Sequence, residues 1–142
     1  MPRIAAACAA FALAALAPVT TAAASPAALD CAPGFDAIHA ATLAQPGVIP
    51  EMTLDAEWNW SAANSVLDIF TLPNNPAHPA VLHLVLQKDG ARTWAGYLSG
   101  GAFGDVEKFK TWMASYRDLN RSAIEDLKEG RPVGPPPAQQ SE

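Results

Sequence analysis

Thr53-Leu-Asp-Ala-Glu-Trp-Asn-Trp60 is the stretch on which the fold of this chain depends. Polar and apolar residues alternate along its whole length, and this period of two is typical of a strand with one wet face and one buried face. Ser61-Ala-Ala-Asn64 has the composition of a turn, and Val66-Leu-Asp-Ile-Phe-Thr-Leu72 that of the returning strand. The sequence therefore predicts an antiparallel hairpin over residues 53–72.

Two further strands are expected after this hairpin. Ala80–Leu86 is a nearly continuous apolar run, and Asp89-Gly90 is a strong hairpin signal between it and Arg92–Leu98. Gly96 inside the last run indicates either a bulge or a large side chain packed across the strand. Ser99-Gly-Gly-Ala102 is expected to end the sheet.

One helix is predicted before these strands in the chain and another after them. Residues 35–45 carry Phe35 and Ile38 at helical spacing, and Pro46-Gly47 ends the run. A much longer helix is expected from a cap at Asp105 to about residue 128, because apolar residues recur at steps of three and four and form one broad face. Such a face must cover another part of the protein.

The fold class that follows is α+β. We expect a four-stranded antiparallel meander, since parallel crossovers need connections of a dozen residues or more. The long C-terminal helix should pack on one face of the sheet, and the short N-terminal helix should cover an edge or share that face. This single domain would span residues 35–130, after a flexible leader at 25–34 and before a Pro-rich, disordered tail at 131–142.

Residues 1–24 have the layout of a secretory signal peptide. A basic start at Met1–Arg3 precedes the apolar run Ile4–Ala17 and a stretch of small residues. The apolar run is shorter than the roughly 20 residues of a membrane-spanning helix. We expect cleavage after Ala23 or Ala24 and a periplasmic or secreted protein without a membrane anchor; a retained anchor is the alternative.

The charge balance excludes one large class of partners. The chain has 9 Lys and Arg against 14 Asp and Glu, a formal net charge of −5. Nucleic-acid binding depends on clustered basic residues, so no nucleic-acid partner is expected, whereas a basic partner would suit the chain.

Signal cleavage would leave Cys31 as the sole cysteine, which excludes an intramolecular disulfide. Cys31 is then either an intermolecular or reactive thiol or a small side chain without a role.

No motif for catalysis or cofactor binding is present, so no catalytic residue, cofactor or metal site is predicted. The sequence lacks Gly-x-Ser-x-Gly, a phosphate-binding loop, His-Glu-x-x-His and Cys-x-x-Cys. His78, in the proline-rich loop 73–79, and His83, on the following strand, are the candidate binding residues, with Asp68 as a partner that could orient one of them. Trp60 is the tryptophan expected to be exposed for recognition. The alternative is that the histidines are structural and all the tryptophans belong to the core.

Three functions remain open at this point. The first is an exported, non-catalytic protein that binds another envelope macromolecule, such as an inhibitor, immunity or accessory protein, through the open face or edge of the sheet and the proline loop. The second is a small hydrolase or ligand-binding enzyme that uses His78 and His83. The third is a structural or stress-related envelope protein. The sequence leaves the oligomeric state and the partner open.

Overall fold

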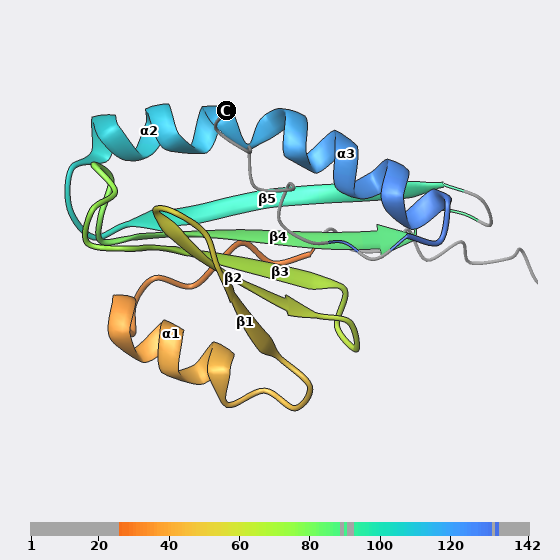
Figure 1. Ribbon diagram of the computed structural model, residues 1–142, viewed down its shortest axis with the longest axis horizontal. Coiled ribbons are helices and arrows are strands. Elements are labelled where there is room, and N and C mark those ends of the chain that lie inside the picture. Colours follow the sequence, from red (N-terminus) through yellow and green to blue (C-terminus); the bar gives the residue numbers. More distant parts are fainter. Residues whose placement is uncertain (1–25, 89, 91–92, 132, 134–142) are drawn as a thin grey trace, which may run out of the picture.

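The computed structural model describes residues 26–88, 90, 93–131 and 133, which form one sheet with helices on both faces (Figure 1). In chain order the elements are α1 (Phe35–Leu43), β1 (Ile49–Met52), β2 (Ala56–Ser61), β3 (Val66–Thr71), β4 (Ala80–Lys88), β5 (Trp94–Ala102), α2 (Val106–Ser115) and α3 (Arg117–Lys128). The predicted signal peptide lies outside the described residues. None of the helices in the described part has the length and apolar character needed to cross a membrane.

The strands form an antiparallel meander in the order β1-β2-β3-β4-β5. The α+β class and the antiparallel arrangement are confirmed, but the predicted number of four strands is wrong. The additional strand, β1, is Ile-Pro-Glu-Met, and all four residues are exposed. An edge strand with both faces exposed needs no alternating pattern, and Pro50 argues against a central strand but is tolerated at a sheet edge.

The two faces of the sheet carry different cores. On β4, Leu82, Leu84 and Leu86 belong to the larger cluster, which Phe109 of α2 and Ala123 of α3 complete. A smaller cluster on the opposite face joins Ile38, Phe70 and Val81, with Phe35 and Phe103 packed against it. Figure 1 shows α1 on one side of the sheet and α2 with α3 on the other. The expectation that the first helix covers an edge or shares the face of the long helix is therefore wrong.

The predicted long helix follows one face of the sheet as expected, in two segments separated by Tyr116. Asp105 caps α2 as predicted, because its carboxylate accepts hydrogen bonds from the backbone N–H groups of Glu107 and Lys108 (3.0 and 3.1 Å). At the break, the N–H of Tyr116 bonds to the carbonyl of Met113 at 3.1 Å. This bond spans three residues instead of four, so a single tighter turn separates α2 from α3.

The glycines of β5 allow close packing against the strand. Asn120 of α3 packs directly on Gly96, and its Nδ2 donates to the carbonyl of Gly96 at 3.2 Å. Of the two readings of Gly96, the packed side chain is the one observed. The sheet ends within Ser99–Ala102 as expected, but the strand predicted over Arg92–Leu98 is longer, because β5 continues to Ala102 and pairs with β4 throughout. Glycine disfavours a strand locally, but the packing of neighbouring elements on Gly100 and Gly101 outweighs that preference.

Parts of both predicted terminal segments contact the domain. In the predicted leader, Leu29 packs with the smaller cluster, and Cys31 lies against Gly101 as a partly exposed thiol that forms no disulfide within the described part of the chain. The predicted tail falls mostly outside the described residues. Of the two tail residues that are described, Arg131 pairs with Asp126 (2.6 Å) and Glu129, and Val133 is buried against the larger cluster.

Candidate functional site

A buried carboxylate and a histidine meet in the centre of the sheet, on the face that α1 covers. Oδ1 of Asp68 on β3 lies 2.5 Å from Nδ1 of His83 on β4, and the two residues are direct cross-strand partners. The Asp68 side chain is 7% exposed and that of His83 19%. Because a carboxylate accepts hydrogen bonds, Nδ1 carries the shared hydrogen, and Nε2 of the neutral ring is an acceptor directed away from Asp68.

A serine extends this pair into a row across three strands. Ser99 on β5 stands directly opposite His83, just as Asp68 does on the other side. Opposite side chains on one face have Cβ atoms about 4.5–5.5 Å apart. The Oγ of Ser99 accepts a hydrogen bond from the backbone N–H of Leu29 (3.0 Å), so its own hydrogen can serve another acceptor. The row Asp68–His83–Ser99 is a candidate proton-transfer site that the sequence motifs do not reveal.

The short helix α1 is attached to the sheet by polar contacts beside this row. Thr42 donates to Oδ2 of Asp68 at 3.3 Å, and Nε2 of His39 lies 2.8 Å from Oε1 of Glu57. Asn59, 1% exposed, donates from Nδ2 to the same Glu57 oxygen at 3.0 Å. Each of these contacts stabilises the polar layer between α1 and the sheet. All of them also have an ordinary structural role, since buried polar groups need partners.

The four predicted binding residues do not form one site. Asp68 and His83 meet, but His78 lies at the end of the sheet, where its Nδ1 contacts the carbonyl of Thr71 at 2.9 Å and its ring packs against Phe35. Trp60 is on the opposite face, half-buried against the larger cluster. Within the described residues, no group of three or more His, Cys, Asp or Glu side chains is arranged to hold a metal ion.

Aromatic side chains pack between the α2–α3 junction at Tyr116 and Trp58 of β2. The ring of Tyr116 lies 5.9 Å from that of Trp58 and 5.3 Å, edge-on, from that of Trp112. Burial, with a smaller contribution from the negative charge of Asp55, raises the pKa of Tyr116 to about 12, although Trp112 opposes the shift. The phenol therefore stays neutral across the physiological range, as suits a side chain that stabilises the core.

A second candidate surface lies along the free edge of β1. It exposes the large apolar side chains of Ile49 (76%), Met52 (61%) and Leu54 (90%). Glu51 is exposed on the same strand and on the same face as Ile49, whereas Met52 points to the other face. We call these four residues the β1 edge surface. Natural edge strands are blunted by shortness, proline or charge, above all lysine; β1 is four residues long and has Pro50 and Glu51, but no basic residue.

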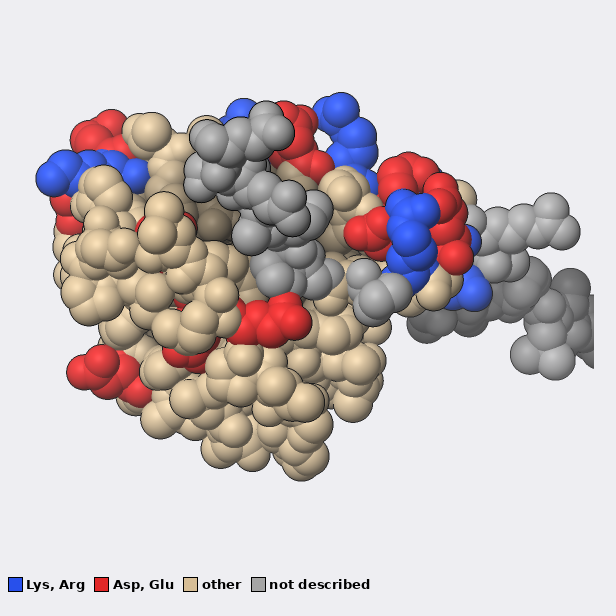
Figure 2. Space-filling view, viewed as in Figure 1, with Lys and Arg blue, Asp and Glu red and all other residues tan. Residues whose placement is uncertain are grey.

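The sequence contains a signal for this surface in its charge distribution. No Lys or Arg occurs between Arg3 and Lys88, whereas that span contains Asp30, Asp36, Glu51, Asp55, Glu57 and Asp68. In the view of Figure 2 the basic residues gather over α2 and α3, and none is visible over α1 and β1. The net charge alone conceals this asymmetry, because the two halves are summed.

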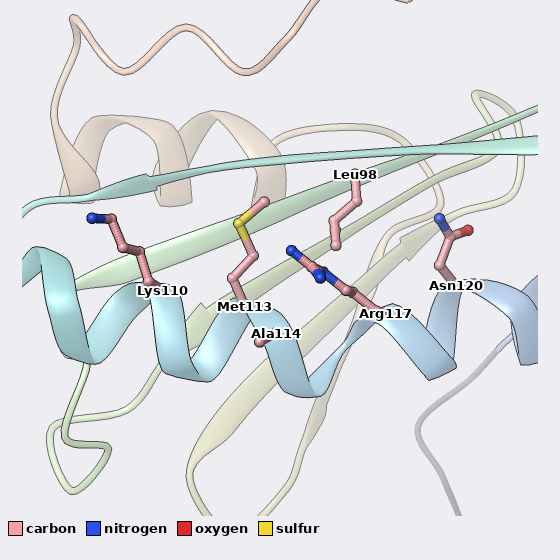
Figure 3. Close-up of a pocket in the computed structure, with 6 residues that line it drawn as sticks. All are labelled: Leu98, Lys110, Met113, Ala114, Arg117 and Asn120. Atoms are coloured by element: carbon pink, nitrogen blue, oxygen red, sulfur yellow. The ribbon is translucent and has the colours of Figure 1, made fainter.

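A third feature is an open groove of about 490 Å³ between β5 and the two C-terminal helices (Figure 3). Leu98 of β5, Met113 and Ala114 of α2 and Asn120 of α3 line it, together with two basic side chains, Lys110 and Arg117. Its volume falls within the range of small-molecule sites.

No protein-family model, curated protein or solved structure matches this chain.

Proposed function

We propose that this is an exported, non-catalytic protein that binds another envelope macromolecule through the β1 edge surface. The observation that carries the proposal is the exposure of Ile49, Met52 and Leu54 along one sheet edge. Singly exposed apolar residues are ordinary, but several gathered on one edge favour an interaction site. Full burial of each such side chain contributes about 1.5–3 kcal/mol, which is enough to offset part of the cost of association.

The charge around this surface supports a basic protein as the partner. Glu51 and Asp55 lie on or next to the β1 edge, and the described chain up to residue 87 has no cation to neutralise them. Complementary charge increases the association rate and disfavours acidic competitors. A partner that presents lysine or arginine between apolar side chains would therefore fit this edge.

Replacing Ile49 and Met52 together by serine should weaken partner binding by about tenfold or more, because both side chains lose their apolar contact. The measurement is affinity capture from envelope extract, followed by titration of the purified partner at low and high salt. Val106→Ser is the matched control, since Val106 is an exposed apolar residue (52%) on α2. The proposal would be contradicted if the double variant captured the partner as well as the wild-type protein does. It would also be contradicted if the wild-type protein were a monomer that captured no partner.

A small hydrolase is the second candidate, and the short contact between Asp68 and His83 favours it. In this reading Ser99 Oγ attacks an ester carbonyl while Nε2 of His83 takes the hydroxyl proton, and Asp68 stabilises the resulting imidazolium. His83 then returns the proton to the departing alcohol, and water releases the acid from Ser99 by the same route. His78, which the sequence suggested, has no part in this chemistry.

Ser99→Ala and His83→Gln should each lower hydrolysis of a p-nitrophenyl ester by about 100-fold or more if this second reading holds. His78→Gln, a histidine outside the row, should keep full activity. The thermal stability of each variant is measured alongside, because His83 also has a structural contact. Turnover that survives in Ser99→Ala with the fold intact excludes the hydrolase.

A further inference from the structure

We propose that the groove between β5 and the α2–α3 junction binds an amphiphilic carboxylate. Its polar end would lie against Arg117 and Lys110, and its hydrocarbon part along Leu98 and Met113 (Figure 3). The groove lies at β5, the opposite edge of the sheet from β1, and on the opposite face from the row Asp68–His83–Ser99. It is therefore independent of the proposed function.

Arg117 differs from the other basic residues of the two helices. Each of the others has a carboxylate within 4 Å in the described part of the chain; these residues are Lys108, Lys110, Arg121 and Lys128. Arg117 has no such partner among the described residues, and Figure 3 shows its side chain reaching across the groove toward Leu98. A planar guanidinium with open donors is suited to a carboxylate, which it can bind through two parallel hydrogen bonds.

The rest of the groove fits the apolar part of such a ligand. Lys110 and Arg117 are two helical turns apart, and Met113 and Ala114 lie between them on the same side. Leu98 forms the wall on β5, and Asn120 closes one end because it is tied to the carbonyl of Gly96. A cation beside an apolar lining distinguishes an amphiphilic anion from both a neutral lipid and a small inorganic anion.

The charges of the neighbourhood favour one anionic group. Lys110 already pairs with Glu107 at 2.8 Å, and both side chains are largely exposed. Lys110 should therefore contribute less to binding than Arg117. The expected occupant has a single carboxylate on a hydrocarbon chain of medium length, as in a free fatty acid.

The test uses decanoate as the probe, with Met ¹³C-methyl NMR on the full protein. Met113 lines the groove, while Met52, on the exposed β1 edge, reports general hydrophobic adsorption. We expect saturable shifts of Met113 with decanoate and none of Met52, and much weaker binding of decanol and of decyltrimethylammonium. Equal binding of decanol, or parallel shifts of both methionines, would overturn the proposal.

Two exposed substitutions locate the carboxylate. Arg117→Gln should weaken decanoate binding about tenfold or more, whereas Arg121→Gln, one turn further along and paired with Asp118, should leave it unchanged. Ala114→Glu should weaken it as well through charge repulsion, while Ala114→Gln serves as its neutral counterpart. Retained affinity in both Arg117→Gln and Ala114→Glu would overturn the assignment.

Discussion

Gly100→Ala should lower the free energy of unfolding by about 2–3 kcal/mol, although only one methyl group is added. A Cβ at this position would lie 2.6 Å from the carbonyl oxygen of Val81 and 2.9 Å from Cζ of Phe109. The first contact is with the backbone of the neighbouring strand, so no side-chain rotation relieves it. Either β4 and β5 separate locally or α2 is displaced with Phe109.

The adjacent glycine is a matched control for this prediction. Gly101→Ala makes the same change to the unfolded chain and to strand propensity, but its Cβ would meet the thiol of Cys31 and the ring of Phe103 instead. These are side-chain atoms, and Cys31 lies outside any helix or strand, so both can shift. Chemical denaturation should show the larger loss for Gly100→Ala. Equal losses would mean that the clash with Val81 is not the cause.

Asp68→Ala should lower the free energy of unfolding by about 3 kcal/mol. Asp68 is 5% exposed and accepts hydrogen bonds from both Thr42 and His83. Its removal leaves two donors without an acceptor in a layer that α1 shields from water. The helix also loses one of its few polar contacts with the sheet, so proteolysis within residues 35–45 should become faster.

A double-mutant cycle separates the hydrogen bond between Asp68 and His83 from the effect of the lost side-chain volume. His83→Ala alone should cost less than Asp68→Ala, since it leaves one group unpaired, and the double variant should cost less than the sum of the two. The measurement is urea denaturation of the four proteins at one pH. Asp118→Ala, at a 90% exposed carboxylate, should change stability by no more than about 0.5 kcal/mol. If the losses of unfolding free energy from Asp68→Ala and His83→Ala were strictly additive, the contact between the two side chains would contribute nothing to stability, contrary to the prediction.

Much of the secondary structure was predictable because its signals are local. Alternation predicts a strand over Thr53–Trp60; β2 begins only at Ala56, but Trp58 and Trp60 lie on one face of it as the pattern predicts, and Leu82 and Leu84 do so on β4. The cap at Asp105 likewise needs only neighbouring backbone groups. The sequence does not predict β1, because an exposed edge strand of four residues needs no apolar face. Its pairing with β2 therefore produces no alternation of polar and apolar residues.

The candidate sites depended on information that lies outside any one segment. Strand period fixes which residues share a face, but the register between strands decides which of them meet. Histidines at 78 and 83 seemed equivalent by type, yet only His83 is opposite Asp68, because β4 begins after His78. Ser99 joins the row through the register of β5, which pairs it with His83.

The sequence by itself determined the α+β class, the antiparallel order of most strands, the capped start of the C-terminal helix and a chain half without basic residues. Only the tertiary structure decided that α1 covers the face opposite α2 and α3. Only it showed that Asp68 and His83 meet between α1 and the sheet, and that Arg117 reaches across a groove. The physical reason is range: periodicity and capping arise from neighbours in the chain, whereas faces, register and unpaired charges depend on contacts between residues far apart in it.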